Sequence, residues 1–319
     1  MKKISSVCFG RFQSATVGHR SNDHRFPAAR RGTPATFRKT CGAGVPPAVL
    51  ALSVLLSLCG PAHAATIVKA SNATSWNVGT SWVGGVAPGI LDVAQWNSTV
   101  TGANTTTLGN GLYIGELQIL NPGGAVTVNA DGNTLVLNGI SGTGIDMSSA
   151  TQNLTLNCPV LLGSTQNWNV ASGQTLSVGG IVSGGAGLTL AGSGTVLLSG
   201  NNTYTGGTTV AGGTLKAGNS YAFGPSGSQI TVQSGATLDL GGCDLENSNY
   251  PISVGGSGVN GNGAIVNSGG YGYVGNLALS SDTTIGGTNP WTVFGYGTSG
   301  NGYYGTVLVL CQSQKLGLA

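Results

Sequence analysis

The chain has 319 residues, of which 57 are glycine and only 7% are charged, with a formal net charge of +3. The positive charge is confined to residues 1–64, which hold nine of the twelve Lys and Arg against one acid, Asp23, so the remainder carries −5. The three histidines, His19, His24 and His63, lie in the same segment. The body of the chain therefore excludes Ser-His-Asp and Cys-His catalysis and His-containing zinc sites. It also lacks a basic surface for nucleic acid, so no nucleic-acid partner is expected.

Residues 1–64 predict a secretory signal peptide with a long basic n-region. An apolar run of eleven residues, Ala48–Leu58, follows the basic part, and Ala62-His63-Ala64 supplies a small-x-small cleavage site. Eleven residues are too few to cross a bilayer as a helix. We therefore expect export of the chain and no retained membrane span.

Residues 65–111 form a Trp-rich segment that we interpret as an N-terminal cap. Trp76, Trp82 and Trp96 fall within some twenty residues. A stack of strands leaves its first coil with unpaired backbone groups and an open apolar core, and large aromatic side chains can close that end. The alternative is an exposed platform on which sugar rings stack.

Residues 112–319 contain short apolar runs separated by Gly, Asn, Asp and Ser, a pattern that predicts strands. No helix is predicted. This pattern predicts an all-β fold, a parallel β-helix or solenoid. Gly and Asn permit the corners, which need φ > 0, and the scarcity of charge avoids like charges stacked about 4.8 Å apart on neighbouring coils. At about 20–25 residues per coil, residues 65–319 would form about ten to twelve coils; two packed antiparallel sheets are the alternative. The predicted strands are Leu112–Ile114, Leu117–Leu120, Ala125–Asn129, Thr134–Leu137, Leu154–Leu162, Thr175–Val182, Leu188–Leu190, Thr195–Leu198, Thr208–Leu215, Gln229–Gln233, Ala236–Leu240, Ile252–Val254, Ala264–Val266, Leu277–Leu279, Thr283–Ile285, Trp291–Phe294 and Thr306–Leu310.

Residues 187–218 are the most informative stretch of the chain. From Gly192 to Leu215 they read GSGTVLLSGNNTYTGGTTVAGGTL, with the specific core NNTYTGGTT at 201–209. This order resembles the autotransporter-associated β-strand repeat (PATR) of bacterial surface proteins. The resemblance implies a right-handed parallel β-helix and brings no catalytic residues. It further implies an autotransporter-passenger type of protein, secreted or held at the outer-membrane surface of a Gram-negative-type bacterium, with an adhesin-like or structural role.

Within this repeat, Asn201 and Asn202 are expected to make the turn itself. Tyr204 is expected to be a half-buried ring that packs over the corner between coils and keeps its hydroxyl at the surface.

The acidic residues are the remaining candidates for catalysis. The densest group is Asp239, Asp244 and Glu246, and a glycoside hydrolase would need two carboxylates about 5–10 Å apart. We interpret Asp239 as an outward solvated strand residue, and Asp244 and Glu246 as corner residues. No catalytic residue, cofactor or metal site is therefore predicted. The alternative function is a carbohydrate-binding or polysaccharide-degrading β-helix, whose partners would be polysaccharides or cell-surface ligands.

Two further features concern the cysteines and the end of the chain. Cys158, Cys243 and Cys311 are widely spaced, so buried small residues are expected rather than a disulfide. Residues 305–310, GTVLVL, echo the opening of the repeat at 194–199, but the NNTYTGG core does not follow. We therefore expect the β-helix to be truncated at its C-terminus.

Overall fold

The computed structural model describes residues 64–295, 305–309 and 314–316. Contacts divide the chain into two units, Met1–Leu58 and Cys59–Ala319, and all the described residues belong to the second unit. The predicted signal peptide and Cys311 lie outside the described residues. Across the part that is described, no helix is both long enough and apolar enough to cross a membrane.

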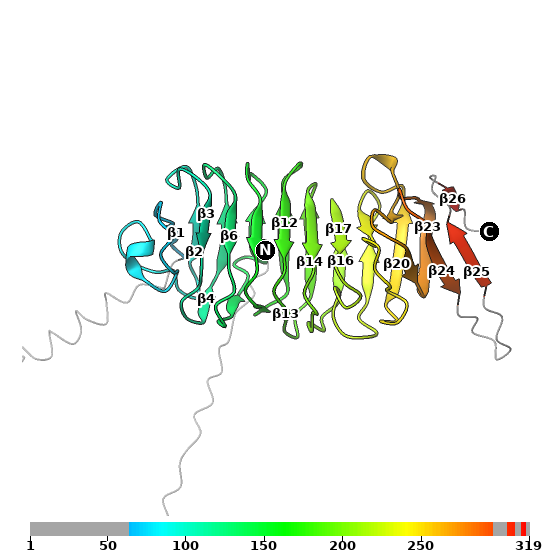
Figure 1. The fold of residues 1–319 in the computed structure, drawn as a ribbon, viewed down its shortest axis with the longest axis horizontal. Helices are drawn as coiled ribbons and strands as arrows, with labels where there is room; N and C mark the ends of the chain where they lie inside the picture. The colour runs from blue at the N-terminus through cyan, green and yellow to red at the C-terminus, as the bar shows by residue number, and fades with distance from the viewer. Residues whose placement is uncertain (1–63, 296–304, 310–313, 317–319) are drawn as a thin grey trace, which may run out of the picture. The chain divides into compact units, whose positions relative to one another are not determined.

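The second unit is a parallel β-solenoid of about nine turns, which confirms the predicted fold class. Strands from successive coils stack side by side along the solenoid (Figure 1). Its only helical pieces among the described residues are two 3-10 turns, η1 (Gly79–Ser81) and η2 (Val259–Gly261). The turn count is lower than expected because, among the described residues, parallel pairing ends at β23 and β24, after which the strands pair antiparallel. Coil length varies: Leu188 pairs with Thr208, 20 residues later, whereas Leu117 pairs with Ile145, 28 residues later.

The strands form three faces. The first face contains β1 (Thr66–Val68), β2 (Val93–Trp96), β5 (Glu116–Ile119), β8 (Thr143–Met147), β11 (Gln166–Val170), β14 (Leu188–Gly192), β16 (Thr208–Val210), β18 (Ile230–Val232), β20 (Pro251–Gly256) and β23 (Asn276–Ile285). The second contains β3 (Asn104–Thr106), β6 (Val126–Val128), β9 (Leu154–Leu156), β12 (Thr175–Val178), β15 (Thr195–Leu198), β17 (Thr214–Ala217), β19 (Thr237–Asp239), β21 (Ile265–Val266) and the end of β23. The third contains β4 (Leu112–Ile114), β7 (Leu135–Leu137), β10 (Val160–Leu162) and β13 (Val182–Ser183), followed farther along by β22 (Gly272–Val274) and β24 (Trp291–Gly295).

Register explains why the alternating sequence folds this way. On the first face Leu190, Val210, Val232 and Val254 occupy successive rungs and point into the core, where all are at most 2% exposed. Their neighbours Thr189, Thr209, Thr231 and Ser253 form the adjacent outward ladder. Because successive side chains of a strand point to opposite faces, one stacked pattern builds both an apolar core and a hydroxyl-covered surface.

Parallel pairing begins at β1, whose Thr66 pairs with Val93 of β2. The Trp-rich segment 65–111 therefore contains the first strands of the stack as well as its cap. At the other end the pairing changes direction: β25 (Gly305–Val309) runs antiparallel to β24, and β26 (Gln314–Leu316) runs antiparallel to β23. The strand predicted at 306–310 thus exists, but it does not restart the parallel repeat.

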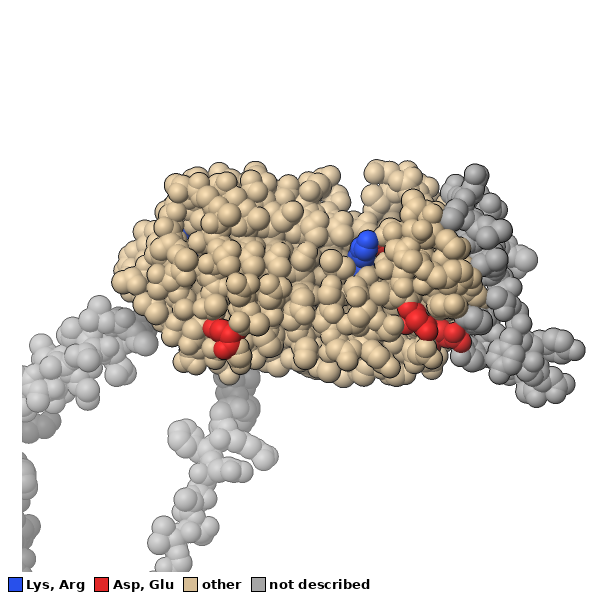
Figure 2. All heavy atoms as spheres, in the orientation of Figure 1, with Lys and Arg blue, Asp and Glu red and all other residues tan. Residues whose placement is uncertain are grey.

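Charged side chains are sparse on the solenoid. The face drawn in Figure 2 shows only a few acidic and basic groups within a broad uncharged surface. Outward amides instead form a ladder across coils, since Gln95 Nε2 donates to Gln118 Oε1 at 2.6 Å and Gln118 Nε2 donates to Asp146 Oδ2 at 3.0 Å.

Candidate functional site

The corner of the repeat is held by an inward-facing amide. Asn202 is 3% exposed, whereas the preceding Asn201 is exposed. The Oδ1 atom of Asn202 accepts a hydrogen bond from Val182 N of the previous coil at 2.7 Å, and its Nδ2 atom donates to Ala222 O of the next coil at 2.6 Å. One side chain thereby satisfies backbone groups on both sides of its own coil. The predicted turn role of the Asn pair is thus divided, with Asn202 acting as a bridge between coils.

Tyr204 lies deeper than predicted. Its side chain is fully buried, and its hydroxyl hydrogen-bonds Thr208 Oγ1 at 2.7 Å. The expectation of a half-buried ring with a surface hydroxyl is therefore wrong. The inward-facing Thr208 supplies the polar partner that a buried phenol requires. Burial raises the pKa of Tyr204 well above its ordinary value. The group is a structural anchor of the repeat and is not available as a surface binding residue.

The two glycines after Tyr204 allow neighbouring coils to approach closely. A Cβ atom at Gly206 would lie 2.2 Å from the backbone carbon of Ala186 and from the nitrogen of Gly187. Gly207 adopts φ +79°, which L-residues other than Asn and Asp rarely tolerate. Glycine is therefore required at Gly206 for a steric reason and at Gly207 for a conformational one.

The prediction that Asp239 is solvated is wrong, because its side chain is buried. Its carboxylate joins three coils. Its carboxylate accepts hydrogen bonds from Ser268 N at 3.0 Å, Ser268 Oγ at 2.5 Å and Gly241 N at 3.0 Å. Lys216 Nζ lies 3.5 Å from Asp239 Oδ2 and donates to Ser268 Oγ at 2.7 Å. We call Lys216, Asp239 and Ser268 the inter-coil clamp.

Residues far along the chain cover this part of β19, since Ser268, 29 residues after Asp239, donates to its carboxylate. The loop between β20 and β21, gold in Figure 1, projects beyond the neighbouring coils. It also hydrogen-bonds β19, since Thr237 Oγ1 donates to Gly263 O and accepts from Val259 N. A local alternation of inward and outward residues does not reveal such a cover.

A cavity of about 450 Å³ borders the clamp and is lined by Gly261, Asn262, Val266, Asn267, Ser268, Gly287 and Thr288. The clamp resembles a serine–lysine pair, but its bonds run in the wrong direction for nucleophile activation. Lys216 donates to Ser268, and Ser268 in turn donates to Asp239. An ammonium that donates to the hydroxyl cannot also accept its proton. The arrangement therefore fits a structural clamp.

Asp244 and Glu246 lie in the turn that follows, away from the clamp's hydrogen bonds. Asp244 Oδ1 accepts from Glu246 N at 3.0 Å and its Oδ2 accepts from Asn247 Nδ2 at 2.6 Å. These bonds fit the predicted corner role. Among the residues described, no group of three or more His, Cys, Asp or Glu is placed to hold a metal ion.

The three tryptophans of the cap form one buried cluster. Trp76, Trp82 and Trp96 are at most 2% exposed, and their ring centroids lie 4.7–5.9 Å apart. Each indole N–H has a partner: Thr106 Oγ1, Trp76 O and Asn104 Oδ1, respectively. This buried cluster at the first coils fits the predicted capping role. The alternative of a sugar-stacking platform is wrong for these rings, because no indole face is open to solvent.

A buried lysine beside the cap was not predicted. Lys69 is fully buried, and its ammonium donates to Ala70 O, Asn72 O and Asn72 Oδ1 at 2.8–3.1 Å. Burial lowers the pKa of Lys69 to about 8. The sequence offered no signal, because nothing local marks this lysine as enclosed by carbonyls.

Two carboxyl groups on neighbouring coils of the first face have shifted pKa values in opposite directions. Burial, followed by repulsion from Asp146, raises the pKa of Glu116 to about 7. Although burial opposes it, hydrogen bonds from Ser148 and Gln118 hold the pKa of Asp146 below its ordinary value. We therefore expect the stability of this coil to depend on pH.

The cysteines in the described part are free. Cys158 is fully buried, and burial raises the pKa of its thiol to about 12; Cys243 is partly buried. The predicted role as small buried residues holds for Cys158, and neither thiol forms a disulfide.

Comparison with known proteins identifies the repeat. Residues 188–217 match the family model described as the passenger-associated-transport-repeat. The resemblance inferred for 187–218 is thereby confirmed. No curated protein and no solved structure matches the chain. Together with the β-solenoid, the repeat indicates a passenger-like surface or secreted protein of the Gram-negative type.

Proposed function

We propose that this chain is an exported, non-enzymatic surface protein of the autotransporter-passenger type, which acts as a rigid adhesin-like or structural stalk. The observation that carries the proposal is the continuity of the matched repeat with the rest of the solenoid. Strands β14, β15, β16 and β17 of the repeat pair in parallel register with coils on both sides. The repeat is thus a section of one stack, which suits a protein whose task is to extend from a surface.

The chemistry of the outward side chains supports a structural role. Three acids on the solenoid are engaged in hydrogen bonds that fix turns or join coils: Asp92 with Ala65 N and Gly89 N, Asp131 with Gly109 N and Asn133 N, and Asp239 within the clamp. Carboxylates used in this way are poor candidates for general acid–base work, which needs a group free to exchange a proton with substrate.

Surface exposure is tested in the native organism with an antibody against the solenoid. We expect intact cells to bind the antibody, or the culture medium to contain the protein, and external protease to remove the cell-bound signal. A matched chain that lacks residues 1–64 should remain inside the cell. Retention of the complete chain in the cytoplasm would overturn the proposal.

Polysaccharide degradation is the alternative function. It is tested by incubating the folded protein with neutral and acidic polysaccharides and measuring new reducing ends and unsaturated products. We expect none above a heat-denatured control. Product formation that Asp239→Asn or Asp244→Asn abolishes would establish an enzyme instead.

A further inference from the structure

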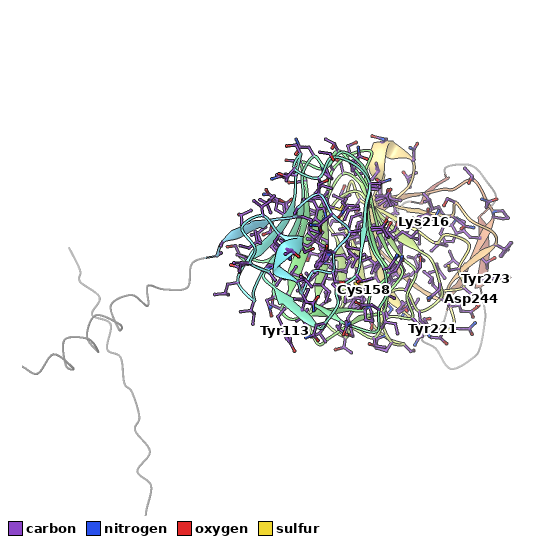
Figure 3. The ribbon with its side chains drawn as sticks, turned by 60° about the vertical axis from the view of Figure 1, so that its left-hand side comes forward. Tyr113, Cys158, Lys216, Tyr221, Asp244 and Tyr273 are labelled. Carbon is purple, nitrogen blue, oxygen red and sulfur yellow. The ribbon has the colours of Figure 1, made fainter. Side chains whose placement is uncertain are left out.

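The C-terminal half of the third face carries aromatic rings that are exposed or partly exposed. Tyr221 is 45% exposed and Tyr271 is 42% exposed, although most large side chains of this solenoid are buried. Tyr221, Asp244 and Tyr273 occur in three successive coils, and Figure 3 shows them along one margin of the molecule. We call Tyr221, Asp244, Tyr271 and Tyr273 the tyrosine strip.

Backbone contacts fix the order of these coils. Asp244 and Tyr273 form a parallel bridge, with Leu245 N donating to Tyr273 O at 2.9 Å. The coil of Asp244 rests on that of Tyr221, because Ser248 Oγ donates to Ser220 O at 2.6 Å. At about 4.8 Å per coil, Tyr221 and Tyr273 are separated by about 10 Å along the axis. This distance is about the length of a disaccharide.

Contacts fix the backbone at Tyr221 and the rings of Tyr271 and Tyr273. Tyr221 N donates to Asn219 Oδ1 at 2.6 Å, and Asn219 Nδ2 donates to Ser199 O of the preceding coil at 2.7 Å. The rings of Tyr271 and Tyr273 pack 4.9 Å apart, and the Tyr271 hydroxyl bonds Thr292 Oγ1 at 2.6 Å. Ordered aromatic rings lose little entropy when a ligand binds.

Polar groups lie beside the rings. A hollow of about 290 Å³ adjoins Tyr221 and is lined also by Asn201, Asn202, Thr203, Pro225 and Ser226. Each carboxylate oxygen of Asp244 accepts one of the bonds described above and retains capacity for another donor. Rings that stack on a sugar face, flanked by amide, hydroxyl and carboxylate groups that bind its hydroxyls, form a site for carbohydrate.

The charges near the tyrosine strip disfavour an acidic ligand. The two lysines within residues 64–295 are Lys69, which is buried beside the cap, and Lys216, which belongs to the clamp. The strip itself carries the acid Asp244, with Glu246 two residues away. An acidic polysaccharide would meet repulsion here without a compensating cation.

We propose that the tyrosine strip binds an extended neutral polysaccharide, with Tyr221 and Tyr273 stacking on sugar rings about one disaccharide apart and Asp244 accepting hydrogen bonds from sugar hydroxyls. This inference rests on the proposed function, since it names the ligand of the displayed stalk. It moves carbohydrate recognition from the buried tryptophans of the cap to tyrosines nearer the other end of the solenoid, where Tyr221 is exposed and Tyr273 is partly buried.

The test uses the full chain in native gels of two kinds. One contains hydroxyethyl cellulose, a soluble neutral β-glucan, and the other contains polygalacturonate, which is acidic. We expect the neutral glucan alone to retard the protein. Tyr221→Ala and Tyr273→Ala should each weaken retardation at least about fivefold, which corresponds to about 1 kcal/mol of binding free energy.

Tyr113→Ala is the matched control, because Tyr113 is 57% exposed on the same third face but lies in β4, far from the strip in sequence and coil order. It should retain full retardation, and circular dichroism should show an unchanged fold for all three variants. Absence of retardation by the neutral glucan, stronger retardation by the acidic chain, or equal loss in the Tyr113→Ala variant would each overturn the proposal. Surface exposure without glucan binding refutes the strip alone, whereas glucan binding by a protein retained in the cytoplasm refutes the surface role alone.

Discussion

At the scale of single residues, coil-to-coil polar bridges hold the stack together where the strands end. Asn202 is the clearest example, because it joins its own coil to Val182 before it and to Ala222 after it. Replacement by alanine would leave a buried donor and a buried acceptor without partners. Such a loss is far more costly than removal of an exposed amide.

We therefore expect Asn202→Ala to lower the free energy of unfolding by about 2–3 kcal/mol, measured by urea denaturation followed by circular dichroism. Asn201→Ala provides the control, since Asn201 is exposed and should change the value by less than about 0.5 kcal/mol. Equal effects of the two variants would refute the bridging role of Asn202.

Glu116 predicts a pH dependence. Its pKa rises from 4.5 to about 7 in the folded state, so between these values the folded protein binds more protons than the unfolded chain. The contribution of this group to stability is then present at low pH and is lost as pH rises through about 7. Glu116→Gln should remove this part of the slope of melting temperature against pH from 4.5 to 7, and should be more stable than the parent at pH 8. An unchanged slope in the variant would contradict the assignment.

At the scale of the coil, glycine sets how closely neighbours approach. Gly206→Ala would force a methyl group against backbone atoms of Ala186 and Gly187, which cannot move without shifting the whole rung. We expect a loss of about 2 kcal/mol or more in unfolding free energy. Gly185→Ala, one coil earlier, meets nothing within 4 Å and should be close to neutral in the same denaturation experiment. A neutral Gly206→Ala variant would show that the corner can relax.

Strand positions were largely readable from the sequence. The predicted Thr195–Leu198 coincides with β15, and alternation correctly separates the buried Val196 and Leu198 from their outward neighbours. The predicted Leu154–Leu162 instead divides into β9 and β10 at a corner, because apolar residues continue across the bend. Strand β8, TGIDM, was missed, since its Gly144 interrupts the pattern. In the structure that glycine makes room for Gln166 of the next coil.

The candidate sites were harder to predict because they depend on contacts between coils. Alternation alone gives Asp239 an outward direction, and only Ser268, 29 residues later, reveals that it is covered. Likewise nothing local distinguishes Asn201 from Asn202. To predict the tyrosine strip, one would need to know that Tyr221, Asp244 and Tyr273 lie in successive coils. That order depends on irregular loop lengths, which strand periodicity does not reveal.

At the scale of the whole molecule, each coil contacts mainly the coils next to it. Stability in such a stack is a sum of coil terms and nearest-neighbour terms, so damage at one end should decay along the axis. The cap offers a direct test, because Trp96 is fully buried at the first coils and pairs in register with Ile119 of the following one.

We expect Trp96→Ala to remove several kcal/mol of local packing, as is typical of large-to-small core changes. Native-state hydrogen exchange should then lose protection most strongly in β1, β2 and β5, less in β8, and little in β18 and β20. Val232→Ala serves as the comparison, since Val232 lies in the core of β18 and should shift the loss of protection to that region. Uniform loss along the solenoid in the Trp96→Ala variant would mean that the stack unfolds as one cooperative unit. A decaying loss would instead support a stalk whose distal coils stay folded, and can keep the tyrosine strip in place, while the capped end opens.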